Sequence, residues 1–303
     1  MENENRVDEY LQRIELNRPN NISDEEYLIQ LHIGHLTHIP FETFDLIDLK
    51  ELNIELDYIF ERLVRQKRGG VCYQMNGLFA FILQNFNYKV QLIPCGVYWN
   101  DKDDYFDDYS HLAICVTLKN GEQFLCDVGF SMDSLTPLFF RKDCIQYATN
   151  GFYRLTKMND QLYYKLEQGY LKKDVQFPLS STFQTSIVDI DPECISWRNS
   201  YRFRINFAEK STKLEDFQST CPYIVHSPDV FLNHYTVCHL HTCQPTIGVG
   251  AYAISGKEYC EWIYKDGHMI RTLTPLSTDE SELKQLLKEK FNLIIERKIE
   301  LVN

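Results

Sequence analysis

The sequence has no apolar run long enough to span a membrane, no internal repeat and no low-complexity segment. Its first ten residues, MENENRVDEY, are polar and acidic, so we predict no secretory signal peptide. The glycine-rich phosphate loops GxxxxGK(S/T) and GxGxxG are also absent. These absences favour an ordinary globular protein without a membrane partner and without the common nucleotide-binding signatures.

Basic charge is scarce. The 303 residues include 31 Lys and Arg against 43 Asp and Glu, which gives a formal net charge of −12. Such a chain repels phosphate backbones, so we predict no nucleic-acid partner. The densest basic cluster is Arg62, Arg65, Lys67 and Arg68, and we interpret it as a solvated helix face. We also expect a monomer.

Cysteine is not scarce, but its spacing is irregular. The ten cysteines follow no compact pattern, so we interpret them as reduced thiols of a cytoplasmic protein. In CHLHTC, strand alternation would place His239, His241 and Cys243 on one face. No fourth ligand is evident there, and we predict no metal site. His32 and His35 belong to a three-residue repeat that we interpret as an ordinary helix face.

Apolar periodicity predicts an α+β chain. Helical periods cover residues 7–16, a segment capped by Ser23, and residues 56–67. From residue 89 the period changes to two, so that KVQLIPCGVYW, HLAICVTL, QFLCDVGF, FYRLTK and LYYKLEQ predict antiparallel strands. TDESELKQLLKEKFN predicts a C-terminal helix capped by Thr278. The order is therefore helical, then β, then α/β.

The segment RGGVCYQMNGL, residues 68–78, is the most informative one. The apolar stripe that follows it predicts a helix beginning at Cys72, with the cysteine on the buried side. The two preceding glycines permit a tight, close backbone approach. A helix N-terminus favours a thiolate, and its unbonded N–H groups can hold an oxyanion. Cys72 is either a nucleophile or a buried structural cysteine, and this segment alone leaves both open.

A thiolate nucleophile needs a base and a group that orients the base. His111 begins the predicted strand HLAICVTL, and Asp127 lies at the end of QFLCDVGF. The turn signal LKNGEQ joins the two strands. These two residues are candidates for the base and its orienting carboxylate, while the alternative for His111 is a partly buried histidine at a strand end.

The length of the turn determines whether Asp127 lies on the same face of the sheet as His111. A two-residue loop would make Asp127 face away from His111. A three-residue loop with Gly121 in the left-handed bulge position pairs Leu118 with Glu122 and places Asp127 on the same face as His111. We predict the three-residue loop.

Together these residues resemble the arylamine N-acetyltransferases. The family motif RGGxCx(E/Q)xN matches RGGVCYQMN at residues 68–76, and its PFE segment matches residues 40–42. A histidine that opens a strand matches His111, and the DxGFG segment matches DVGFS at residues 127–131. EDFQSTCPYIVHSPDVF, residues 215–231, is similar to the family's lid segment. The resemblance covers nearly the whole chain.

The resemblance implies an N-terminal helical bundle at residues 1–88, a central antiparallel β-barrel at 89–198 and a C-terminal α/β lid at 199–303. It implies a cysteine-protease-like catalytic core. The implied reaction is ping-pong transfer of an acetyl group, through a cysteine thioester, from acetyl-CoA to small aromatic amines, arylhydrazines or arylhydroxylamines. Acetyl-CoA is then a co-substrate, and no bound cofactor is expected.

The resemblance also implies roles for individual residues. Cys72 is the acetylated nucleophile, His111 its base partner and Asp127 the group that orients His111. Arg68 and Glu42 resemble a structural ion pair behind the site.

The resemblance further implies residues that contact the two substrates. Those expected to contact the aromatic acceptor are Phe41, Ser110 and Phe130. Those expected to approach CoA are Asp107, Tyr223 and Asp229.

Several positions depart from the family pattern. The spacing from His111 to Asp127 is one residue longer than usual, which the three-residue loop absorbs. Ser131 replaces the last glycine of DxGFG, and Asp229 lies where a small hydroxyl residue is common. The loop NDKDDYFDDYS, residues 100–110, carries five aspartates near the family's CoA site. Their charge disfavours phosphate binding there and leaves the CoA pose open.

Two other functions remain as alternatives. One is a cysteine hydrolase or transglutaminase-like acyltransferase with the same core. The other is an acyl-CoA-binding relative with an altered donor preference. RGGVCYQMN and the lid segment argue against the first, and the complete set of Cys, His and Asp argues against an inactive relative.

Overall fold

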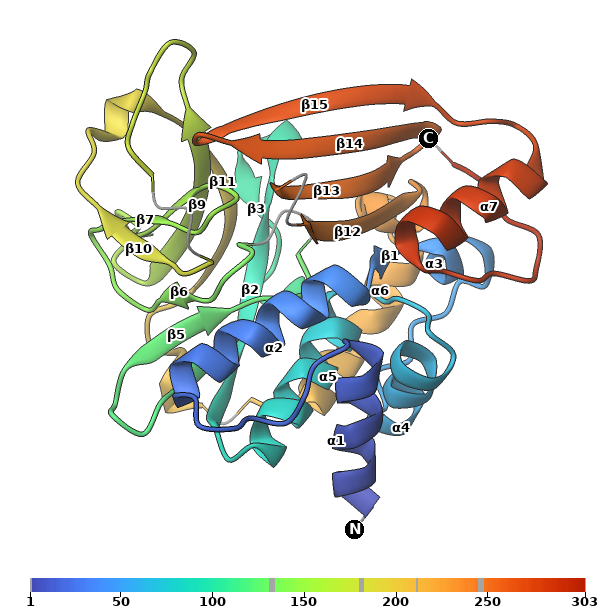
Figure 1. The fold of residues 1–303 in the computed structure, drawn as a ribbon, viewed down its shortest axis with the longest axis horizontal. Coiled ribbons are helices and arrows are strands. Elements are labelled where there is room, and N and C mark those ends of the chain that lie inside the picture. The colour runs from blue at the N-terminus through green and yellow to red at the C-terminus, as the bar shows by residue number, and fades with distance from the viewer. Residues whose placement is uncertain (1, 131–133, 180–182, 211, 245–247, 303) are drawn as a thin grey trace.

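The structure is a computed structural model that describes residues 2–130, 134–179, 183–210, 212–244 and 248–302. It has three groups of elements, seen in Figure 1 as a set of helices, a large curled sheet and a second, five-stranded sheet across the top. The α+β class predicted from the periodicity is confirmed. Within the described residues, no helix combines the length and the apolarity needed to cross a membrane.

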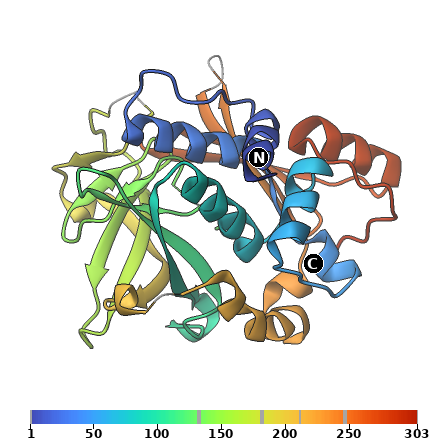
Figure 2. The ribbon, with the colours of Figure 1, turned by 90° about the horizontal axis from the view of Figure 1, so that it is seen from below.

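The N-terminal helices pack together. They are α1 (Glu2–Arg13), α2 (Asp24–His38), α3 (Phe44–Asp48), α4 (Leu56–Phe60), which continues into a π-helical turn (Glu61–Arg65), and α5 (Cys72–Asn85). Among them α5 contacts the large sheet while α2 contacts the five-stranded sheet. The Ser23 hydroxyl accepts the Glu26 N–H at 3.1 Å and caps α2, as predicted. Figure 2 shows the helices between the curled sheet and the C-terminal helix.

The large sheet is antiparallel and carries ten strands. They are β2 (Lys89–Trp99), β3 (Asp104–Tyr105), β4 (His111–Thr117), β5 (Gln123–Cys126), β6 (Leu138–Phe139), β7 (Ile145–Tyr147), β8 (Phe152–Lys157), β9 (Tyr163–Leu171), β10 (Ser186–Val188) and β11 (Ile195–Arg204). The order is β10-β7-β8-β9-β11-β2-β4-β5-β6, and β3 pairs with β2. In the described residues β10 and β6 do not pair with each other, so the expected barrel is a curled open sheet.

The five-stranded sheet joins distant parts of the chain. Its order is β1 (Phe41–Glu42), β12 (Val237–Gln244), β13 (Gly248–Ser255), β14 (Glu258–Lys265) and β15 (His268–Pro275). The C-terminal helix α7 (Glu280–Phe291) buries Leu283, Leu287 and Phe291 in an apolar cluster shared with β12 and β13. The predicted cap at Thr278 is wrong by one residue: the Asp279 carboxylate accepts the first N–H groups of α7.

Shorter helical elements complete the chain. They are α6 (Cys221–His226) and the 3-10 turns Asn100–Lys102, Pro192–Cys194, Phe207–Glu209, Leu214–Thr220 and Phe231–Asn233.

Of the two expected domain boundaries, one falls between structural elements and the other falls inside a strand. The boundary between residues 88 and 89 falls just before β2. The boundary after residue 198 falls inside β11, which pairs with β9 along its length and with β2 over residues 201–203. The large sheet therefore extends to Arg204. In addition, β1 belongs to the first segment of the chain but pairs with β12 of the last.

The β4–β5 hairpin has the predicted three-residue loop. The Leu118 N–H donates to the Glu122 carbonyl at 2.8 Å, and the Gly121 N–H donates to the Leu118 carbonyl at 2.9 Å. Gly121 has a φ of 87°, in the left-handed region where glycine is favoured. Ile114 pairs with Cys126, which places Asp127 one position further along, on the same face as His111.

An ionic network joins the nucleophile loop to the C-terminus. Glu42 accepts from Arg62 at 2.6 Å and from Arg68 at 2.8 Å, which confirms the Arg68–Glu42 pair. Asp45 accepts from Arg62, from Arg68 at 2.9 Å and from Arg297 at 2.6 Å. Burial opposes the charge of Asp45, but the surrounding arginines hold its pKa well below the ordinary value.

This network corrects the interpretation of the basic cluster as a solvated face. Arg62 is buried and Arg68 is partly buried, and both guanidinium groups pair with the buried carboxylate of Glu42. Arg65 remains on the surface, where it pairs with Glu9 at 2.7 Å. The apolar period showed the helix, but no local pattern indicates which arginines meet a distant carboxylate.

We predict that Glu42→Gln destabilises the fold by about 3 kcal/mol, because the buried guanidinium of Arg62 and the partly buried guanidinium of Arg68 lose a charged acceptor. Urea unfolding followed by circular dichroism measures the change. Glu9→Gln is the matched control and is expected to change stability little, because the Glu9–Arg65 pair is exposed. Equal losses in both variants would contradict a special role for the buried network.

Candidate active site

Cys72 follows a strap of chain that lies against β1. The Gly70 N–H donates to the Pro40 carbonyl at 3.3 Å, and the Gly70 carbonyl accepts the Glu42 N–H at 3.0 Å. A Cβ on Gly69 would lie 2.1 Å from the Pro40 oxygen, a distance that no side chain tolerates. Neither glycine has a left-handed φ. The two glycines therefore serve the close backbone approach and not a special turn.

Helix α5 begins at Cys72, as the apolar stripe predicts. Val71 is the N-cap, and its N–H donates to the Gln74 side chain at 3.2 Å. Cys72 is 7% exposed and faces a cavity. The first N–H groups of a helix have no acceptor within the helix, so this position offers donors to a developing oxyanion.

His111 and Asp127 form a buried pair. The His111 Nε2 lies 2.7 Å from Asp127 Oδ2, which leaves Nδ1 as the ring nitrogen for Cys72. Burial alone would lower the pKa of His111, but the Asp127 carboxylate, its hydrogen bond and the neighbouring Cys72 raise that pKa to about 10. Burial raises the pKa of Asp127, yet the charge of His111 and its hydrogen bonds hold it below the ordinary value. The geometry therefore favours an imidazolium–carboxylate pair at neutral pH.

Asn76 supports Asp127 from α5, one turn after Cys72. Its Nδ2 donates to Asp127 Oδ1 at 2.8 Å, and its Oδ1 accepts the Val128 N–H at 2.9 Å. The Gly129 N–H donates to the same Asp127 oxygen at 3.1 Å. The sequence analysis did not assign Asn76 a role. The available signal was a polar residue four positions after Cys72, on the same buried face.

Gly129 allows the Asp127 segment to lie directly against α5. A Cβ at this position would lie 2.7 Å from the Cys72 Cα and 2.9 Å from the Cys72 carbonyl. The glycine of the DVGF segment thus permits the contact between the strand end and the helix start.

The cavity beside Cys72 and His111 has a volume of about 250 Å³. The structure places Phe41, Ser110 and Phe130, the three residues expected to contact the acceptor, in its lining. Asp127 lies behind His111 and does not line it. The lining also includes Val97, Tyr98, Asn100, Gly129, Gln168, Arg198, Asn199, Ser200, Phe231 and Leu232.

Besides His111, Arg198 contributes the one cationic side chain among the described residues that line this cavity, which include no carboxylate. Its Nε donates to Gln168 Oε1 at 3.2 Å, across the β9–β11 pair. Sequence reasoning did not identify either residue, because their meeting depends on strand pairing across thirty residues. The cavity is therefore aromatic, with a cation on one wall.

The three residues expected to approach CoA lie outside the lining of this cavity. Asp107, Tyr223 and Asp229 are exposed, Tyr223 by 45%. The backbone carbonyl of Asp107 accepts the N–H of Ser110, a lining residue, at 3.0 Å. Asp229 precedes the lining residue Phe231 by two positions.

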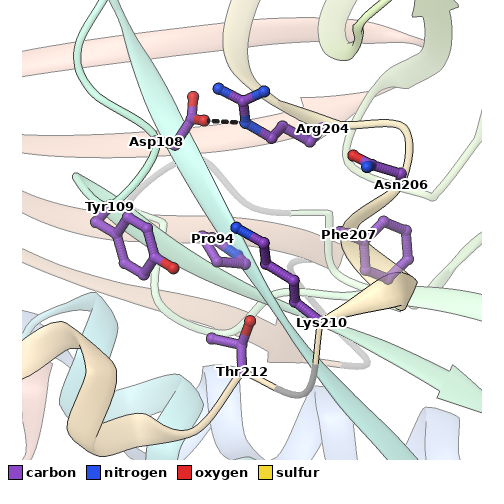
Figure 3. A pocket seen from close by; sticks show the side chains of 8 residues that line it. All are labelled: Pro94, Asp108, Tyr109, Arg204, Asn206, Phe207, Lys210 and Thr212. Carbon is purple, nitrogen blue, oxygen red and sulfur yellow. Dashed lines mark hydrogen bonds and ion pairs between the residues drawn. The ribbon is translucent and has the colours of Figure 1, made fainter.

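A second cavity of about 430 Å³ is lined by Tyr109 and seven other residues (Figure 3). It shares no lining residue with the first and contains no predicted site residue. Asp108 Oδ2 pairs there with Arg204 Nε at 2.7 Å. The other lining residues are Pro94, Tyr109, Asn206, Phe207, Lys210 and Thr212.

The described residues include no cluster of three or more His, Cys, Asp or Glu side chains placed to bind a metal. His239 and His241 share one face of β12, as strand alternation predicts, and their ring centroids lie 4.6 Å apart. Both are buried. Ser131, which departs from the family pattern, lies outside the described residues.

Known proteins are similar to the chain over nearly its whole length. The N-acetyltransferase family model matches residues 24–300. The chain is 26% identical to the liver isozyme of arylamine N-acetyltransferase from Gallus gallus, over 98% of each chain. Among solved structures it resembles the arylamine N-acetyltransferase of Salmonella typhimurium (TM-score 0.74, 22% identity, 95% of this chain and 91% of the other). It also resembles the Mycobacterium marinum enzyme in complex with CoA (TM-score 0.72, 19% identity, 94% and 92%).

The His111 pair predicts a defined pH dependence. Because the folded-state pKa of His111 is raised, the stability that this pair contributes is fully present below the ordinary histidine pKa of 6.5 and is lost progressively as the pH rises from there to about 10. For Asp127 the pKa is lowered, so its contribution is present above the ordinary aspartate pKa and is lost as the pH falls below it. We expect the His111 ring to titrate near pH 10 in NMR spectra of ¹³C-labelled histidine, assigned by His111→Gln.

Asp127→Asn should move the His111 titration to lower pH, because the largest interaction that raises its pKa is removed. Asp108→Asn is the control, since the Asp108 carboxylate pairs with Arg204 and not with His111. An unchanged titration in Asp127→Asn would show that the carboxylate does not set the charge of the imidazole.

Proposed function

The chain belongs to the arylamine N-acetyltransferase family, and from this membership we propose that it transfers an acetyl group from acetyl-CoA to small aromatic amines, arylhydrazines or arylhydroxylamines. One observation carries the proposal. Cys72 begins a helix and faces an aromatic cavity beside a His111–Asp127 pair joined at 2.7 Å. We assign the catalytic roles to these three residues.

In the first half-reaction the Cys72 sulfur attacks the carbonyl carbon of the acetyl-CoA thioester. The tetrahedral oxyanion is held by N–H groups at the start of α5. The bond to the CoA sulfur then breaks, and the leaving thiolate takes a proton from the His111 imidazolium. The products are acetylated Cys72, free CoA and a neutral His111.

In the second half-reaction the neutral amine attacks the acetyl carbon of the enzyme thioester. His111 accepts the amine proton as the nitrogen–carbon bond forms, and Cys72 leaves as a thiolate. Acetylation removes the Cys72 charge, which is one of the interactions that raise the pKa of His111. The pKa of His111 therefore falls as Cys72 is acetylated, which favours transfer of its proton to the leaving CoA thiolate, and it rises again as the Cys72 thiolate is released in the second step.

Substrate contacts are also part of the proposal. Phe41 and Phe130 form walls of the site for the acceptor ring, since both line the cavity together with Cys72. The Ser110 hydroxyl accepts the Val97 N–H at 2.9 Å and donates to the Cys95 carbonyl at 3.3 Å, so Ser110 shapes the wall and does not donate freely to a ligand.

For CoA we propose the exposed rim formed by Asp107, Tyr223 and Asp229. Asp107 and Asp229 adjoin lining residues of the Cys72 cavity, which is consistent with a route from the rim to the thiol. The CoA complex of the related Mycobacterium marinum enzyme supports a fold of this type as a CoA binder.

The finer architecture and setting are proposals as well. We propose a helical bundle, a curled sheet and an α/β lid around a cysteine-protease-like core, and a monomeric enzyme. The ten cysteines are all free thiols, which supports a reducing cytoplasmic setting.

We predict that brief incubation with acetyl-CoA alone adds one acetyl group to the wild-type protein and none to Cys72→Ala. Intact-mass spectrometry measures the adduct, and subsequent addition of aniline or an arylhydrazine should release it as the N-acetyl product. Cys221→Ala is the matched control, because Cys221 is a second buried thiol close enough to interact electrostatically with Cys72.

The other outcomes separate the alternatives. Rapid loss of the acetyl group to water without an amine would indicate a hydrolase. Acylation by malonyl-CoA or propionyl-CoA but not by acetyl-CoA would indicate an altered donor preference. Binding of acyl-CoA without any adduct, in a folded protein, would indicate a non-catalytic relative.

A further inference from the structure

His32 lies on α2, fully buried, and the triad assignment gives it no role. Its ring packs edge-on against Phe79 of α5, with centroids 5.7 Å apart. His35, one turn later on α2, is equally buried and packs against the same Phe79 at 5.5 Å. The two histidines thus have the same apolar surroundings on one helix face.

Their polar contacts differ. The His35 Nδ1 meets the Tyr10 hydroxyl at 2.9 Å, far from the triad in the chain. The His32 Nδ1 lies 3.1 Å from the Leu135 carbonyl, and its Nε2 lies 3.3 Å from the backbone nitrogen of Asp127. His32 therefore contacts the backbone of the triad carboxylate directly.

These contacts define one tautomer of His32. A carbonyl only accepts hydrogen bonds, so Nδ1 carries the hydrogen and donates it to Leu135. Nε2 is then unprotonated and accepts the Asp127 N–H. A protonated ring would direct a second N–H at the Asp127 N–H, with no acceptor between them. The neutral ring is thus the one that fits, and burial, which lowers the pKa of His32 to about 4, favours it.

The ring joins two ends of one functional segment. Residue 127 carries the triad carboxylate, Phe130 lines the acceptor cavity, and Leu135 is buried in the core. A single rigid imidazole fixes the backbone at Asp127 and at Leu135 to helix α2. Asn76 holds the neighbouring Val128 N–H from α5, so two helices position consecutive residues of this segment.

We propose that His32 is a positioning residue of the acetyl-transfer reaction. As a neutral imidazole it holds the Asp127 backbone, and through it the carboxylate that orients His111. The inference rests on the proposed function, because it assigns the effect of His32 to the triad. It extends the machinery to a helix that contributes no residue in contact with substrate.

The test compares His32→Leu with His35→Leu. Both replace a buried imidazole against Phe79 by an apolar side chain, so both remove packing and hydrogen bonds of similar kind. We expect His32→Leu to slow acetylation of Cys72 by about tenfold to a hundredfold at saturating acetyl-CoA, because a displaced catalytic pair loses its alignment. We expect the KM for acetyl-CoA to change little. The His111 titration should also move to lower pH.

His35→Leu should lower the melting temperature without moving either the acetylation rate or the His111 titration. His32→Gln, which keeps one donor and one acceptor, should restore most of the rate lost in His32→Leu. If His32→Leu does not fold, the comparison of His32→Gln with His35→Gln replaces it. In that pair we expect only His32→Gln to move the His111 titration to lower pH, by less than His32→Leu would.

Three results would overturn the proposal. They are equal rate losses in the two leucine variants, an unchanged His111 titration in a folded His32→Leu protein, and no recovery in His32→Gln. The NMR titration needs no acetyl-CoA. A wild-type protein that is not acetylated would therefore defeat the proposed function, while the titration would still decide whether His32 positions Asp127.

Discussion

The buried carboxylate of Asp127 is the constraint on which the site depends. A charge removed from water is costly unless it is paired and hydrogen-bonded, and Asp127 is only 6% exposed. Its partners come from three places: His111 on β4, Asn76 on α5 and the Gly129 N–H in its own segment. Satisfying this one group therefore fixes α5, and with it Cys72, against the end of the β4–β5 hairpin.

That arrangement requires one strand register. Because side chains alternate along a strand, a shift of one residue would direct Asp127 to the opposite face of the sheet. The loop between Leu118 and Glu122 sets the register, and Gly121 supplies the left-handed backbone that such a loop needs. A turn on the surface thus determines whether a buried catalytic pair forms at the far end of the hairpin.

The difference between local and long-range interactions explains what the sequence could predict. The start of α5 at Cys72, the bounds of β2 and the hairpin register follow from local period and turn chemistry, and the structure has all three. The contact of His32 with Asp127 spans 95 positions, and no local pattern indicates it. A buried histidine on an apolar helix face has the same local pattern whether it binds a neighbouring hydroxyl or a catalytic segment. The local pattern does not indicate the role of Arg62 for the same reason, since its partners Asp45 and Glu42 lie 17 and 20 positions away in the chain.

Charge has to be considered together with its partners. The loop at residues 100–110 carries five aspartates, and its composition alone argues against an anionic ligand nearby. In the folded chain Asp108 pairs with Arg204, and Arg202 lies 4.0 Å from Asp104. Both arginines come from β11, so the strand that completes the large sheet also neutralises part of this loop. The repulsion that a CoA phosphate would meet there is therefore smaller than the sequence suggests, since pairing with a fixed cation cancels much of a carboxylate's field beyond a few ångströms.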